Sequence, residues 1–160
     1  MKTIRFDFDN VPGITAVYAI PLTSFVGIAY NPIFFHEAYP LLIRTEEIVQ
    51  IPVFADSSFS FTEKQSREDG GELWAVEITG MIPKMHPLND ATIRTLERGD
   101  WLVMHRDANG SVQLSGTKDV PLHFLSNKSS GQSSTNGNSF LFSGSEPEPS
   151  LFIHIPVALE

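Results

Sequence analysis

Hydrophobic and polar residues alternate along much of the chain with a period of two, which predicts β-strands with one buried face. The first residues show this clearly, because Ile4, Phe6 and Phe8 stand between charged neighbours. Further strands are predicted at residues 14–20, 46–54, 58–62, 74–79 and 151–157. The strand over 46–54 contains Pro52 and is therefore expected at a sheet edge or a bulge.

A hairpin turn is predicted at Asn109-Gly110, because both residues tolerate a positive φ and favour a two-residue type I′ turn. Strand-like runs flank the turn at residues 101–106 and 111–115. A two-residue loop would pair His105 with Leu114. In that register one face of the hairpin carries Trp101, Val103, His105, Asp107, Val112 and Leu114.

The strand that enters this hairpin is apolar on both faces near its start. Trp101 and Val103 point to one side, while Leu102 and Met104 point to the other. A strand of this kind is expected where a sheet is covered on both faces or where a partner chain packs against it.

One short helix is predicted from about residue 87 to residue 98. Pro87 suits the first helical position, and Asn89 or His86 can cap the helix. Gly99 is expected to end the helix in a left-handed conformation.

The faces of this helix differ in character. Ile93 and Leu96 are expected to face the core, and Asp90 and Arg94 have the i,i+4 spacing of an ion pair. Because a helix this short is marginal alone, it should lie against a sheet.

The composition changes sharply at residues 126–139, which contain no apolar side chain and one charge, Lys128. This stretch is predicted to be a polar Ser/Asn/Gly loop. Apolar segments resume at Phe140, so the loop should connect strands within a single domain spanning residues 1–160. The predicted fold is all-β or β-dominated α+β, a β-sandwich or barrel of roughly eight to ten strands with one flanking helix.

Charge and cysteine content exclude several classes of function. The 160 residues include 11 Lys and Arg against 19 Asp and Glu, which gives a net charge of −8, and no Cys. A chain this acidic is not expected to bind nucleic acid directly, because such binding relies on neutralising phosphates. The absence of Cys excludes disulfides, thiol nucleophiles and Cys-ligated metal sites.

The N-terminal third is unusual in its distribution of charge. Charged residues interrupt residues 1–9, so no secretory signal is expected. Residues 10–36 contain no Asp, Glu, Lys or Arg and are long enough to cross a bilayer. Three prolines and two glycines break this segment, so two or three buried strands or a hydrophobic loop are expected instead of a membrane span.

His105-x-Asp107 places an imidazole and a carboxylate on one face of a strand, a spacing that serves a metal site or an acid/base pair. No third ligand or nucleophile is indicated by the sequence. We therefore interpret His105 as a histidine near the end of a hairpin and Asp107 as an exposed turn residue.

Other candidate chemistry is sparse. The remaining histidines, His36, His86, His123 and His154, form no ligand motif, and the adjacent acids at 46–47 and 68–69 lack the spacing of a calcium loop. No GxSxG, GxGxxG or P-loop string occurs. The sequence assigns no catalytic, cofactor-binding or metal-binding residue, so we expect a protein without cofactors that is not an enzyme.

The aromatic residues comprise 12 Phe, 3 Tyr and 2 Trp. Dominance of Phe indicates core packing or a protein interface, whereas a sugar-binding platform uses exposed Trp and Tyr. Such a platform would need Trp74, Trp101 and two of the three tyrosines, Tyr18, Tyr30 and Tyr39, to be exposed and coplanar.

The order of strands and glycines from about residue 72 to residue 155 resembles a known group of proteins. It runs through ELWAVEITGMIPK at 72–84, the short helix, the hairpin at 101–115, Pro121-Leu122-His123-Phe124 and FLFSG at 140–144. In this respect the chain resembles uncharacterised prophage-encoded tail-tube-like or tail-associated proteins of gut Bacteroidetes.

The resemblance implies a non-enzymatic structural or assembly subunit that associates with itself or with other virion proteins, in the cytoplasm during assembly or in the virion. A negative chain could then line a lumen through which DNA passes. Residues 10–36 would be either an arm that docks on a neighbouring subunit or a pair of core strands. The alternative function is a ligand-binding module, perhaps for carbohydrate.

Overall fold

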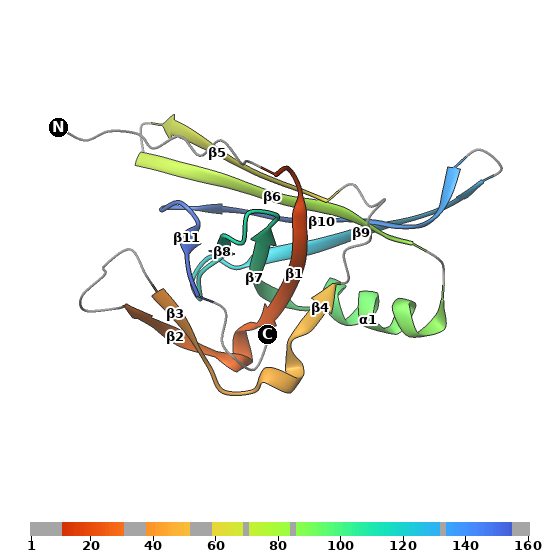
Figure 1. The fold of residues 1–160 in the computed structure, drawn as a ribbon, viewed down its shortest axis with the longest axis horizontal. Coiled ribbons are helices and arrows are strands. Elements are labelled where there is room, and N and C mark those ends of the chain that lie inside the picture. Colours follow the sequence, from red (N-terminus) through yellow and green to blue (C-terminus); the bar gives the residue numbers. More distant parts are fainter. Residues whose placement is uncertain are drawn as a thin grey trace.

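The structure is a computed structural model that describes residues 11–30, 38–51, 59–68, 71–83, 86–131 and 134–154. The strand predicted around Ile4–Phe8 lies outside these residues. Among these residues strands dominate, all their pairings are antiparallel, and one α-helix flanks them (Figure 1). The predicted β-dominated α+β fold is therefore confirmed.

The elements occur in the following order: β1 Ile14–Pro21, the 3₁₀ turn η1 Leu22–Ser24, β2 Phe25–Tyr30, β3 Ala38–Leu42, the 3₁₀ turn η2 Thr45–Glu47, β4 Val49–Ile51, β5 Ser60–Glu68, β6 Gly71–Pro83, α1 Pro87–Glu97, β7 Asp100–Asp107, β8 Val112–Ser115, β9 Leu122–Gly131, β10 Ser134–Glu146 and β11 Leu151–Phe152. Of the strand predicted at 46–54, residues 49–51 form β4, and residues 52–54 lie outside the described residues.

Strand β7 joins the two halves of a nine-stranded sheet. One edge of β7 pairs with β1, and the other edge pairs with β9 at its start and with β8 further along. Beyond β9 the order continues through β10 and β6 to β5, whereas β4 pairs with β1. The described strands of this sheet do not close on themselves, so the predicted sandwich or barrel is not confirmed. Strands β2 and β3 form a separate two-stranded ribbon (Figure 1).

The two apolar faces of β7 belong to two different cores. Trp101 and Val103 pack in a cluster that β1, β6, β9, β10 and α1 also line. Leu102 and Met104 pack in a second cluster, together with Phe25 of the β2–β3 ribbon. Of the two alternatives predicted for this strand, the structure shows cover on both faces. Strand β1 lies between the same two clusters, so the segment Ile14–Pro21 is a core strand.

Helix α1 forms almost where the sequence predicts it. His86 is the N-cap, and its Nδ1 accepts a hydrogen bond from the backbone N–H of Leu88 at 3.2 Å. Ile93 and Leu96 are buried, as expected for the face that packs against the sheet. This short helix is held by that burial, because isolated helices of its length are marginal.

Gly99 does not adopt the predicted left-handed conformation. A Cβ atom at this position would lie 2.7 Å from the Trp101 ring, so glycine is needed for close approach instead. The indole Nε1 donates to the carbonyl of Leu96 at 2.8 Å, which fixes the ring beneath the end of the helix.

The predicted register of the β7–β8 hairpin is wrong by one residue. His105 pairs with Gln113 and Met104 pairs with Leu114. The loop contains three residues, because Asp107 N–H donates to the Ser111 carbonyl and Gly110 takes a φ of 86°. A slip of one residue moves every side chain to the other face, so Val112 and Leu114 join the second core beside Met104.

The polar loop predicted at 126–139 is also wrong for the described residues. Residues 126–131 continue β9 and residues 134–139 belong to β10. Asn138 pairs with Lys128 and Ser139 pairs with Asn127. Backbone hydrogen bonds hold this extension of the hairpin, and its side chains are mostly exposed. The polar composition therefore reflects exposure to solvent and not the absence of a strand.

Candidate functional site

His105 lies near the hairpin end of β7, as the sequence predicts, and its side chain is buried. The side chain is 4% exposed, and its ring centroid lies 4.2 Å from that of Phe61 on β5. Burial lowers the pKa of His105 to about 4, although the charges of Asp107 and Glu63 and a hydrogen bond to Gln113 oppose the shift. The imidazole is therefore neutral at neutral pH.

Asp107 closes the hairpin loop. Its Oδ1 accepts hydrogen bonds from the backbone N–H groups of Asn109 at 2.9 Å and Ser111 at 2.8 Å. Asp107 and His105 both line a pocket of about 410 Å³, which Phe59, Phe61 and Gln113 also line. Among the described residues no three His, Asp or Glu side chains are grouped so as to hold a metal ion.

A buried carboxylate, which the sequence analysis missed, lies at the end of β10. Glu146 is 3% exposed, and its Oε1 accepts a hydrogen bond from the backbone N–H of Gly116 at 2.8 Å. Burial raises the pKa of Glu146 to about 7, the Gly116 N–H opposes this shift, and the charge of Glu63 adds to it. Alternation from Phe140 through Phe142 places Glu146 on the core face, a signal that was available in the sequence.

The neighbours of Glu146 form a buried polar network. Ser115 and Ser150 join through their hydroxyl groups at 2.8 Å. The backbone N–H of Ser150 donates to Oε1 of Glu63 at 2.7 Å. Together with Glu146, these contacts anchor both ends of residues 147–149, which connect β10 to β11 and are exposed.

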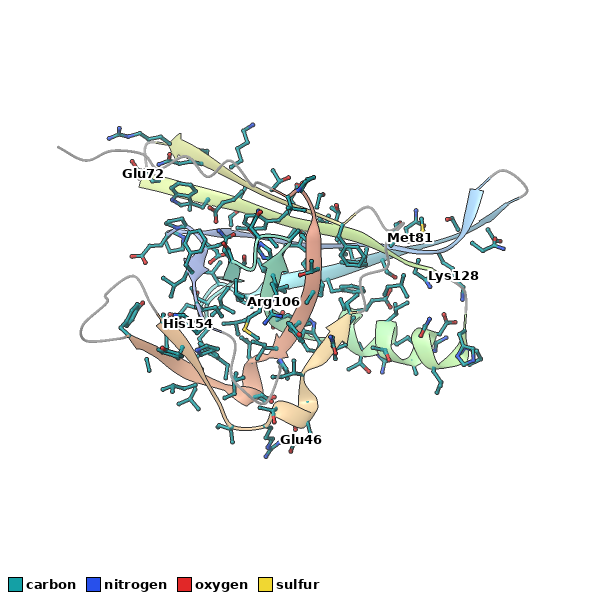
Figure 2. All side chains as sticks on the ribbon, in the orientation of Figure 1. Glu46, Glu72, Met81, Arg106, Lys128 and His154 are labelled. Carbon is teal, nitrogen blue, oxygen red and sulfur yellow. The ribbon has the colours of Figure 1, made fainter. Side chains whose placement is uncertain are left out.

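The other sequence candidates have structural roles or lie outside the described residues. His123 pairs with Asp100 at 3.0 Å on the surface, and His154 stacks on Tyr39 with ring centroids 5.0 Å apart. Figure 2 shows His154 beside β3. Glu47 binds Ser24 and Arg44, and these hydrogen bonds lower its pKa. His36 is not among the described residues.

The aromatic platform required for sugar binding does not form. Trp101 is 3% exposed and Tyr18 is 5% exposed, so neither can stack on a ligand at the surface. Tyr30 and Tyr39 are exposed, but they belong to the β2–β3 ribbon.

The outer side of the β2–β3 ribbon is an exposed apolar surface. Tyr39, Leu41 and Ile43 alternate along β3 and just beyond it, with exposures of 42%, 45% and 67%. Gly27 and Ala29 of β2 lie opposite Leu41 and Tyr39 in the register. We call Tyr39, Leu41 and Ile43, with the adjoining Val26, the assembly face. Its two strands carry no charged residue.

The inner side of the ribbon holds it against the body of the protein. Phe25 and Ala38 are buried in the second core, and the backbone N–H of His154 donates to the Ala38 carbonyl at 2.8 Å. A two-stranded ribbon is marginal on its own, so this packing keeps its outer side in a fixed position.

No family model, no curated protein and no solved structure matches the chain. Among the described residues, no helix has the length and apolar character needed to cross a membrane.

Proposed function

We propose that the chain is a non-enzymatic structural subunit that associates with copies of itself through the assembly face. The observation that carries this proposal is an exposed, uncharged and apolar sheet surface on a chain of net charge −8. Large apolar side chains gathered on one surface are characteristic of a protein interface. Tyr39 adds an aromatic ring, a residue type enriched in interfaces.

The charge of the chain favours this surface over the others for contact between copies. Two identical chains of charge −8 repel each other, and salt screens that repulsion over about 8 Å at physiological ionic strength. Strands β2 and β3 of the assembly face carry no charge that would repel a second copy. Burying this face stabilises the contact by about 25 cal/mol for each Å² of apolar surface removed from water.

A phage-tail-like role is the setting we propose for this subunit. The resemblance over residues 72–155 covers β6 to β11 and includes the helix. A negatively charged protein is suited to surround DNA without binding it, because it repels phosphate. The partners are then further copies of the chain or other virion proteins.

Leu41→Lys is expected to weaken self-association by about 100-fold, because it removes an apolar contact and places a charge in the interface. Leu88→Lys is the matched control, since Leu88 is 72% exposed on α1 and lies outside the assembly face. Light scattering over a range of concentrations, with electron microscopy of any large species, measures the effect. A wild-type chain that stays monomeric at every concentration, or equal effects of the two variants, would contradict the proposal.

Ligand binding is the second candidate, and the pocket beside His105 favours it. Nδ1 of this buried histidine has no hydrogen-bond partner among the described residues, so a bound molecule could supply one. Under this alternative, small uncharged alcohols or sugars raise the melting temperature of the wild-type chain. His105→Phe should then abolish the increase, and a screen without any such increase argues against a ligand.

A further inference from the structure

A groove of about 720 Å³ runs between η1 and the C-terminal half of α1. Pro21 and Leu22 supply apolar walls, the largely buried Trp101 also lines the groove, and Arg94 and Arg98 contribute two guanidinium groups. The two arginines are four residues apart, so they project from the same side of the helix. Both are exposed.

The carboxylates near these arginines are already bound elsewhere. Asp90 pairs with Lys128 at 2.8 Å instead of pairing with Arg94 as the spacing predicts. Asp100, which also lines the groove, pairs with His123.

Glu97, the last residue of the helix, is engaged as well, because its Oε1 accepts from the Ser126 hydroxyl at 2.6 Å. Within the described ranges, neither arginine of the groove has an ion pair or a side-chain hydrogen bond. The two guanidinium groups are therefore donors without a bonded acceptor, in a groove that the Asp100 carboxylate also lines.

The end of the helix does not use these donors. The carbonyl of Thr95 accepts from Arg98 N–H, and that of Leu96 accepts from Gly99 N–H and from the Trp101 indole. Cations at this end do offset the helix dipole, but that effect acts through space and leaves their N–H groups available.

An exposed acidic loop elsewhere on the chain complements the groove. Glu148 stands between Pro147 and Pro149 in the connection from β10 to β11, and all three residues are exposed. The prolines restrict the backbone, and the buried contacts of Glu146 and Ser150 anchor the loop at both ends. A carboxylate held in this way loses little conformational entropy when it binds.

We propose that the groove beside α1 binds the Glu148 loop of a second copy of this chain, with the carboxylate between Arg94 and Arg98 and the prolines against the apolar walls. Within one copy the loop cannot fill its own groove, because β7 and β1 stand between β11 and α1 (Figure 1). Two different surfaces meet in this contact, so copies join either head-to-tail, as a ring or a filament, or by reciprocal exchange of loops across a two-fold axis, as a dimer. This inference rests on the proposed self-association and specifies two further surfaces through which neighbouring copies meet.

Peptide binding tests the groove separately from assembly. The probe is a synthetic peptide of residues 144–151, GSEPEPSL, titrated into the full-length Leu41→Lys chain, and the indole fluorescence of the chain or labelled-peptide anisotropy reports binding. We expect saturable binding of the wild-type peptide. A Glu148→Gln peptide, or the Arg94→Gln/Arg98→Gln chain, should weaken this binding at least tenfold, on the order expected for a lost charge-assisted contact. Melting temperatures confirm that the variants are folded. Equal binding of both peptides, or no binding, overturns the proposal.

Charge exchange tests the contact in the assembly. Glu148→Arg and the double variant Arg94→Glu/Arg98→Glu should each reduce the oligomers, and mixing the two variants should restore association. If the wild type assembles and Leu41→Lys disrupts it while both charge variants assemble normally, the groove contact is overturned and the proposed function stands. If the peptide binds but the wild type stays monomeric, both the self-association and the second copy as occupant are overturned.

Discussion

Phe142→Ala is expected to lower the free energy of unfolding by about 3–5 kcal/mol, the range for a large buried aromatic cut back to Ala. Phe142 is fully buried on β10, between β6 and β9. Its ring contacts Phe124 and Phe140 at centroid distances of 4.9 and 5.8 Å. The β-sheet fixes the backbone on both sides, so the cavity cannot collapse easily.

Phe152→Ala is the matched control, because it makes the same substitution on β11 at a position that is 55% exposed. We expect a loss of about 1 kcal/mol or less there. Urea unfolding followed by circular dichroism measures both variants. If the Ala variant of Phe142 does not fold, Phe142→Leu provides a smaller step in the same direction. Equal losses at positions 142 and 152 would contradict the assigned core.

Strands and helix that bury one face were predictable from the sequence. The continuous apolar run at Trp101–Met104 predicted a strand that is covered on both sides or meets a partner chain, and the structure places these residues in two cores. The helix was predictable because Pro87 and His86 mark its start and two apolar residues mark its buried side. In each case the hydrophobic positions in the sequence mark the face of the strand or helix that packs against a core.

Register and exposed strands were not predictable in the same way. The loop after β7 depends on Asp107, whose carboxylate binds two backbone N–H groups and thereby favours three residues in the loop over two. Residues 126–139 lack apolar side chains, yet their backbone pairs within a hairpin that begins in the core. Neither effect changes the hydrophobic pattern, so the pattern alone could not show it.

The candidate surfaces were predictable only in part. The uncharged stretch before residue 36 was evident, but the sequence could not show that β1 is buried while β2 pairs with β3 to expose an apolar side. The alternation from Phe140 pointed to a buried Glu146, but its hydrogen-bond partner was not predictable, because Gly116 is 30 residues away in the chain. Contacts of this kind arise from the tertiary fold.

The largest expected pH effects come from Glu146 and His105, which act in opposite directions. The pKa of Glu146 is raised to about 7, so the folded state retains a proton that the unfolded state releases near pH 4.5. Stability is therefore lost as the pH rises through this interval, by about 3 kcal/mol in total. The pKa of His105 is lowered to about 4, so the folded state resists protonation that the unfolded state accepts near pH 6.5. Stability is then lost by a similar amount as the pH falls from about 6.5 to about 4.

In the wild-type chain, the combined contribution of these two groups to the free energy of unfolding should be nearly constant between about pH 4.5 and 6.5. The loss that Glu146 causes as the pH rises is offset there by the gain from His105. Glu146→Gln keeps an acceptor for the Gly116 N–H and removes the pH dependence that Glu146 contributes. The stability of this variant should therefore rise steadily from pH 4 to pH 6.5. His105→Phe should show the reverse, with stability falling from pH 4.5 to pH 7. Urea midpoints at pH 4, 5.5 and 7.5 measure both profiles, and Glu72→Gln, at an exposed position, is the control. Profiles of the two variants that run parallel to the wild type would show that neither group is buried in the state assigned here.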